Sequence, residues 1–132
     1  MKCGKKLLQS ACRCGSTNLK VLFASNYPDK DTVQYENLVA MVAAEARDQA
    51  GCGVLAVPVT LGIRGYFGIP ASRAKKLQEG QAHTQRPDLD NVIKAIEDGL
   101  NQVLFTDDSL VWRIEASKHW SATPRAEVEV IY

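Results

Sequence analysis

The chain has no long apolar run and almost no net charge. None of its 132 residues belongs to an uninterrupted apolar stretch approaching the roughly 18 residues that span a membrane. The first residues, MKCGKKLLQSACRCG, carry lysines but no apolar core, so we expect no cleaved secretion signal. These absences predict a cytoplasmic protein with no membrane attachment.

Cysteine is also scarce. Four cysteines, unevenly placed, are too few for a disulfide framework in a chain of this length. Cys3, Cys12 and Cys14 lie close together, but the remaining cysteine is the distant Cys52, which is poor spacing for zinc. We therefore expect reduced thiols rather than a structural zinc site.

The net charge of +1 does not by itself indicate a nucleic-acid-binding protein, but the acidic residues are unevenly distributed. Six of the fifteen fall within one stretch of 21 residues: Asp88, Asp90, Glu97, Asp98, Asp107 and Asp108. Such a cluster forms either a solvated surface or a cation site. A bound divalent metal would reverse the local charge and let a phosphate approach.

Length and composition predict a small single domain over residues 1–132, and apolar periodicity gives it strands and two main helices, which is the α/β (α+β) class. Apolar periodicity predicts the order β-α-β-loop-α-β-β. The expected segments are strands 19–23 and 57–67, helices 32–50 and 91–100, a loop at 69–87, and final strands 110–116 and 126–130. Residues 1–18 show no clear periodicity and are left unassigned.

The two final strands are expected to pair with each other through a loop around residues 119–124. Trp112 alternates with the core side of its strand, which predicts that it is packed. Trp120 is expected in the loop, where it either tucks under the hairpin or stacks on a nucleic-acid base.

Asp88 and Asp90 stand directly in front of the second helix, in RPDLDNVIKAIEDGL. An N-cap explains one aspartate, and either would suit the positive end of the helix dipole. Lys94 follows Asp90 by four residues and projects from the same face. It is either half of a surface ion pair or a cation beside metal-binding carboxylates, able to contact a phosphate oxygen.

Asp107 and Asp108 follow the helix. A helix over residues 91–101 is about 16 Å long. The next seven residues can extend about 23 Å, so the chain is long enough to return a carboxylate to Asp88 and Asp90. The alternative is a simple turn before the next strand. If the carboxylates converge, their hard oxygen ligands select Mg²⁺ or Mn²⁺.

The string HTQRPDLDNVIKAIEDGLNQVLFTDDSLV, residues 83–111, resembles the RusA-type Holliday junction endonucleases, a bacterial and prophage-borne family. GIPASRAKK (68–76), the pair Tyr35-Glu36 and the closing PRAEVEV (124–130) extend the resemblance from about Pro28 onward. The family usually opens with a strand and a basic loop that help to hold DNA, and MKCGKKLLQSACRCG has lysines but lacks the Pro-Arg pattern of that loop. The family's fold is a mixed sheet with helices, which agrees with the predicted order.

This resemblance implies a homodimeric, metal-dependent endonuclease that resolves four-way DNA junctions by paired nicks, in DNA recombination and repair. Asp88, Asp90 and Asp108 match the family's acidic metal-binding positions, Lys94 matches its catalytic lysine, and Asp107 is a substitute ligand. The expected contacts to the DNA backbone are Lys75, Lys76, His83 and Arg86, each with a solvated loop residue as the alternative reading. The alternative function is a catalytically silent junction-binding protein on the same scaffold.

Overall fold

The computed structural model of the chain describes residues 18–23 and 32–132. Its elements follow the predicted order. They are β1 (Asn18–Phe23), α1 (Thr32–Gln49), β2 (Val59–Gly68), the 3-10 turn η2 (Ala71–Arg73), α2 (Leu89–Leu100), the 3-10 turn η3 (Asp108–Leu110), β3 (Val111–Ser121) and β4 (Arg125–Ile131). This is a small single α+β domain, as predicted.

The four strands form one mixed sheet in the order β1-β4-β2-β3. β4 is antiparallel to both of its neighbours, whereas β2 and β3 are parallel. The expectation that the two final strands pair is therefore wrong, because β2 lies between β3 and β4. β3 is also longer than predicted, since it continues to Ser121 and so includes Trp120 and the first part of the predicted loop.

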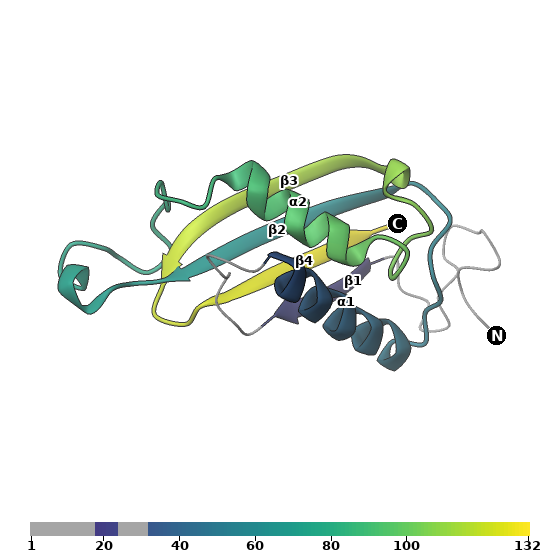
Figure 1. Cartoon of the computed structure of the whole chain (residues 1–132), viewed down its shortest axis with the longest axis horizontal. Coiled ribbons are helices and arrows are strands. Elements are labelled where there is room, and N and C mark those ends of the chain that lie inside the picture. The colour runs from purple at the N-terminus through teal and green to yellow at the C-terminus, as the bar shows by residue number, and fades with distance from the viewer. Residues whose placement is uncertain (1–17, 24–31) are drawn as a thin grey trace.

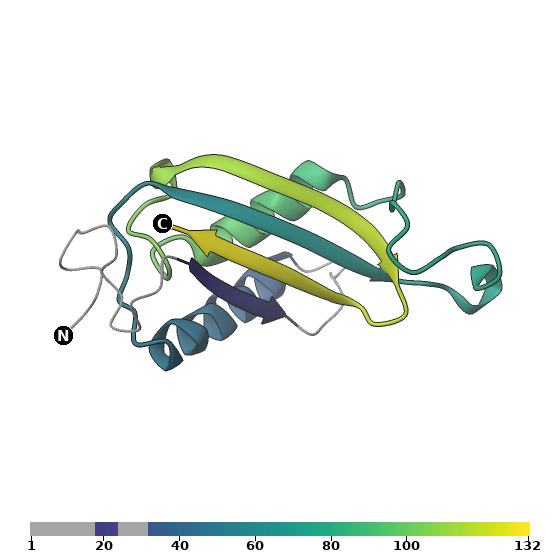
Figure 2. The same ribbon diagram turned by 180° about the vertical axis from the view of Figure 1, so that it is seen from behind.

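Both helices lie over one face of the sheet and leave the other face uncovered by any described element (Figures 1 and 2). The core fills the space between the helices and the sheet. Alternate residues of each strand point to this face of the sheet, and these residues are apolar. Its fully buried large side chains are Phe23, Val39, Val59, Leu61, Ile63, Val92, Ile96, Leu100, Leu104, Phe105 and Val130.

Gly99 sets the distance between α1 and α2. This glycine is buried in the last turn of α2. A Cβ at this position would lie 2.7 Å from the Val39 Cβ and 2.9 Å from the Glu36 carbonyl oxygen. The two helices therefore approach closely because this residue has no side chain.

Trp112 and Cys52 depart from the sequence expectations. Trp112 is 69% exposed rather than packed, because the register between β2 and β3 shifts where Val59 faces Val111 and Thr60 faces Arg113. A bulge of this kind turns the extra residue out of the regular alternation. Cys52 is disulfide-bonded, so the expectation of free thiols is wrong for it. Cys3, Cys12 and Cys14 lie outside the described residues.

Candidate functional site

Asp88 and Asp90 are exposed at the start of α2. Asp88 occupies the N-cap position in extended backbone, but its side chain makes no capping hydrogen bond. Its carbonyl oxygen accepts from the Asn91 and Val92 amides. The Asp90 carboxylate accepts from the Asn91 amide at 3.0 Å. Ordinary capping therefore does not account for the Asp88 carboxylate, and most acceptor positions of this acidic pair face solvent.

The chain that leads into Asp88 is held by β3. Lys118 donates hydrogen bonds to the carbonyl oxygens of Gln85, at 2.7 Å, and Pro87, at 2.6 Å. The bond between Arg86 and Pro87 is cis. Lys118 thus connects the last part of β3 to the two residues on either side of Arg86, directly before the acidic pair.

Lys94 lies one turn into α2, and its ammonium is 3.6 Å from the Asp98 carboxylate. The predicted i,i+4 partner, Asp90, makes no ion pair with it. Both members of the observed pair are well exposed, at 77% and 37% of their side chains. Exposed pairs of this kind are weak, so Lys94 is free to turn toward an incoming anion.

Asp107 and Asp108 lie at the other end of α2. Both views show η3 beside the C-terminal end of the helix, opposite the end that begins at Leu89 (Figures 1 and 2). The Asp107 carboxylate accepts from the Ser109 amide at 3.2 Å, and hydrogen bonding to Ser109 lowers the pKa of Asp107. This is the turn chemistry that the sequence offered as the alternative reading.

The intervening segment does not run back along α2 because its apolar residues are fixed in the core. Leu104 and Phe105 are 1% and 0% exposed. The Leu104 carbonyl accepts from the Leu55 amide at 2.9 Å, and the Leu55 carbonyl accepts from the Thr106 amide at 2.8 Å. Asp108 is therefore held toward the far end of α2, and a helix of 12 residues is about 18 Å long.

Glu97 is an additional acid at this far end that the sequence reading did not assign to the site. Burial raises its pKa, and the nearby charges of Asp108 and Asp98 raise it further. Negative charge in the last turn also opposes the helix dipole, and α2 has no basic residue there. Like charges gathered in this way mark a place where a cation would be favourable.

Within the residues that the structure describes, no three His, Cys, Asp or Glu side chains come close enough to hold a metal ion. One protomer therefore separates the predicted ligands into two groups. Asp88 and Asp90 lie at one end of α2, and Asp107 and Asp108 lie at the other, with Glu97. Each group offers hard oxygen ligands, but neither is a complete site.

The loop that follows β2 projects beyond the end of the sheet (Figures 1 and 2). Lys75 and Lys76 are exposed on it, and Arg86 is exposed nearer to α2. His83 differs from them, being only 5% exposed. Its ring packs between Phe67 and Trp120, with both ring centroids at 4.3 Å, so it is not available at the surface.

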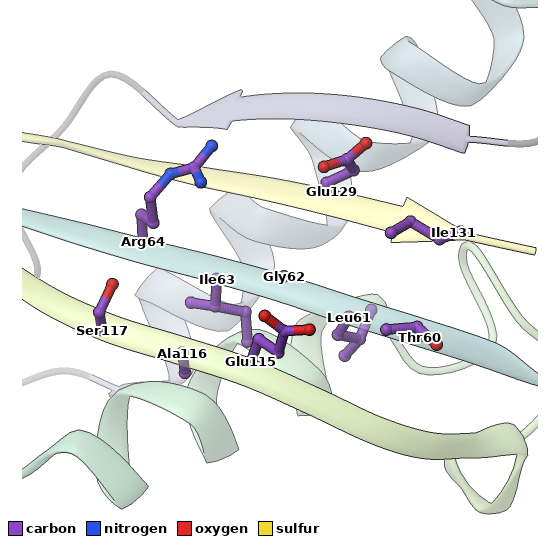
Figure 3. Close-up of a pocket in the computed structure, with 10 residues that line it drawn as sticks. All are labelled: Thr60, Leu61, Gly62, Ile63, Arg64, Glu115, Ala116, Ser117, Glu129 and Ile131. Carbon is purple, nitrogen blue, oxygen red and sulfur yellow. The ribbon is translucent and has the colours of Figure 1, made fainter.

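A shallow hollow on the uncovered face of the sheet does not contain any of the predicted site residues. Gly62 forms its floor, with Glu115 and Glu129 to either side (Figure 3). These acids already have partners, since Glu115 pairs with Arg113 and Glu129 accepts from the Asn18 amide group. The ends of α2 are therefore the better candidate site.

Comparison with known proteins identifies the class. The family model described as "Endodeoxyribonuclease RusA" matches residues 14–131, and the chain belongs to this family of endodeoxyribonucleases. The uncharacterised protein YqaN of Bacillus subtilis (strain 168) is 31% identical over 134 residues, covering 96% of this chain and 90% of the relative.

A crystal structure of a cyanuric acid hydrolase from A. caulinodans aligns with a TM-score of 0.40 and 16% identity. The alignment covers 88% of this chain and 39% of the hydrolase, and a likeness this distant bears on neither activity nor fold.

No described helix is both long enough and apolar enough to cross a membrane.

Proposed function

We propose that the protein is a Mg²⁺- or Mn²⁺-dependent, structure-selective endonuclease that cleaves four-way DNA junctions by paired phosphodiester hydrolysis. DNA recombination and repair would be its setting, and the DNA substrate favours the cytoplasm. The observation that carries the proposal is the exposed pair Asp88 and Asp90, left largely without protein partners in a chain of the RusA family. Oxygen-only ligands of this kind suit a hard divalent cation.

Asp88 and Asp90 would hold the cation, with Asp108 as a further ligand and Asp107 as its substitute. A divalent cation bound there would neutralise charge on the scissile phosphate and make a bound water acidic enough to supply hydroxide. Lys94, on the next turn of α2, would place its ammonium against a phosphate oxygen as negative charge develops. Its weak pairing with Asp98 leaves it free to do so.

We propose that a homodimer completes the site. A two-fold axis perpendicular to α2 would place this helix antiparallel to α2 of a second copy. The N-terminal end of each helix would then lie beside the C-terminal end of the other. The exposed residues Asn91, Lys94 and Asp98 mark the face of α2 available for such an approach. Asp108 of one protomer would then join Asp88 and Asp90 of its partner, giving two sites for two strands.

Lys75, Lys76 and Arg86 would contact the DNA backbone from the projecting loop and its junction with α2. All three are exposed, and their positive charges offset the acidic pair for an approaching polyanion. We assign His83 a packing role instead, because Phe67 and Trp120 enclose its ring.

The alternative is a silent junction-binding protein. A protein that only binds DNA has no use for unpaired carboxylates beside phosphates, which argues for the enzyme. The test incubates a labelled four-way junction with the parent and with Asp90→Asn, each with Mg²⁺ and with Mn²⁺. Cleavage by the parent alone is the expected result. Tight binding by the parent with no cleavage under either metal would instead establish the silent binder.

A further inference from the structure

Lys118 makes an unusual pair of contacts for a strand residue. Its ammonium donates to the carbonyl oxygens of Gln85 and Pro87 at 2.7 Å and 2.6 Å. These carbonyls precede Asp88 by three residues and by one. A single side chain from β3 therefore holds the backbone at two points immediately before the acidic pair.

The chain before these contacts runs along the edge of β3. The Gly80 and His83 amides donate to the carbonyls of Trp120 and Lys118, at 2.8 Å and 3.1 Å, and the Trp120 amide donates to the Gln81 carbonyl at 2.8 Å. Beyond His83 this backbone pairing stops. Among the described residues, Lys118 donates the two hydrogen bonds that hold residues 84–87.

The chemistry of an ammonium suits this task. It carries three donors and no acceptor, so it can bridge two carbonyl oxygens that no backbone amide reaches. A hydrogen bond from a charged donor is shorter and stronger than one between neutral groups. Without it, both carbonyls would turn to water, and the four residues that set the entry angle of Asp88 would lose their attachment to the sheet.

We propose that Lys118 is a positioning residue that fixes Asp88 and Asp90 in the orientation needed to bind a divalent cation. It would act through the backbone of residues 85–87 and touch neither DNA nor metal. The inference rests on the proposed function, since it concerns the same acidic pair. Residues that orient metal ligands commonly change metal affinity by about 10- to 100-fold when they are replaced.

The experiment compares the full-length parent with Lys118→Met and Lys118→Arg, and with Lys20→Met as a matched control. Methionine keeps much of the apolar stem but removes both hydrogen bonds. Arginine keeps the charge and can donate to two carbonyls. Lys20 is exposed on β1, distant in the sheet from β3. The measurements are amide hydrogen exchange over residues 84–92, thermal unfolding, metal-free binding of a four-way junction, and the Mg²⁺ concentration that half-saturates cleavage.

For Lys118→Met we expect exchange over residues 84–92 at least about 10-fold faster and half-saturating Mg²⁺ about 10- to 100-fold higher. Metal-free junction affinity should fall far less than the Mg²⁺ requirement rises, because Lys118 does not hold the Lys75 and Lys76 contacts on the projecting loop, and of the proposed DNA contacts only Arg86 lies in the segment that Lys118 holds. Lys118→Arg should recover most of both losses, and Lys20→Met should match the parent. A role confined to stability would lower the unfolding temperature without moving the Mg²⁺ requirement of the folded protein.

The proposal is overturned if Lys118→Met leaves exchange over residues 84–92 and the Mg²⁺ requirement at parental values, or if Lys118→Arg recovers neither. Should Lys118→Met fail to fold, the same comparison with Lys118→Gln decides. A parent that cleaves no junction under Mg²⁺ or Mn²⁺ would contradict the proposed function. The exchange measurement would still decide whether Lys118 orders the entry to α2.

Discussion

The ammonium of Lys94 lies 3.6 Å from the Asp98 carboxylate, on the side away from Asp88 and Asp90. The lysine that the sequence places beside the acidic pair is thus held by a different acid. An exposed i,i+4 pair is worth about 0.5 kcal/mol or less, which a phosphate can readily outcompete. The observed contact is therefore compatible with a lysine that turns to substrate.

Replacing Lys94 tests that role directly. Lys94→Met should lower the single-turnover rate of junction cleavage about 100- to 1000-fold, as expected for one lost charge-stabilising group. Asp98→Asn removes the competing partner and should keep the parental rate. If Lys94→Met cleaves at the parental rate while the junction is saturated, Lys94 does not stabilise the reacting phosphate.

Mixing two inactive variants tests whether the site is shared between protomers. Asp90→Asn and Asp108→Asn should each be inactive alone. In a mixed dimer with shared sites, one site carries both substitutions and the other carries none, so nicking of one strand returns. Measuring strand-specific nicks after subunit exchange gives the answer. Sites formed within one protomer would leave every mixture inactive.

Salt dependence tests the projecting loop. If Lys75, Lys76 or Arg86 contacts a phosphate, its replacement by alanine should flatten the slope of log K against log salt by about one unit. Junction binding without metal, measured at several salt concentrations, provides the slope. Lys20→Ala, on the sheet far from the loop, should leave it unchanged. An unaltered slope removes the replaced residue from the binding surface.

His83 predicts a pH dependence of stability. Burial, followed by the nearby charge of Lys118, lowers its pKa from the ordinary 6.5. The unfolded chain therefore takes up the proton first as the pH falls. The stability that neutral His83 contributes is complete above about pH 6.5 and is lost as the pH falls toward the folded-state pKa.

His83→Phe should remove this dependence, which can reach about 1.4 kcal/mol per pH unit. The ring would still pack between Phe67 and Trp120, without the buried Nδ1 that has no hydrogen-bond partner among the described residues. Urea unfolding between pH 5.5 and 7.5 measures the difference. If the unfolding free energy of parent and variant changed with pH in the same way, His83 would not be the source of the pH dependence.

Gly99→Ala tests the close approach of the helices. The added Cβ would lie 2.7 Å from the Val39 Cβ, which forces α1 and α2 apart. Overpacking of this kind costs about 1–3 kcal/mol of unfolding free energy. Denaturant unfolding of parent and variant measures the cost. A variant as stable as the parent would show that the two helices separate without loss.

The elements of the fold follow from the sequence because apolar periodicity is a local property. Strand order is not local. The short Ala122–Pro124 connection suggests a hairpin, yet β2 inserts between β3 and β4. The order of the strands depends on contacts between residues that are distant in the sequence. The apolar pattern of each strand does not show which strands become its neighbours. The bulge that exposes Trp112 is likewise a property of two strands in register.

The candidate site also has a part that local sequence predicts and a part that depends on distant contacts. Asp88, Asp90 and Lys94 belong to the start of one helix, and a local pattern predicts where a helix starts. The predicted return of Asp108 to that pair rests on the maximum length of the connecting chain, which limits how far the chain can reach but not its direction. Burial of Leu104 and Phe105 decides the direction instead. Lys118 carried no signal, because its partners are backbone carbonyls.

The attachment of residues 80–87 to β3 has a mechanical consequence. The projecting loop and the start of α2 are fastened to the same strand, so the distance between them is fixed by the sheet. A DNA strand gripped on the loop would meet the acidic pair at a set number of nucleotides from the gripped phosphates. The position of the cut relative to the gripped phosphates would then be set by the protein's own dimensions.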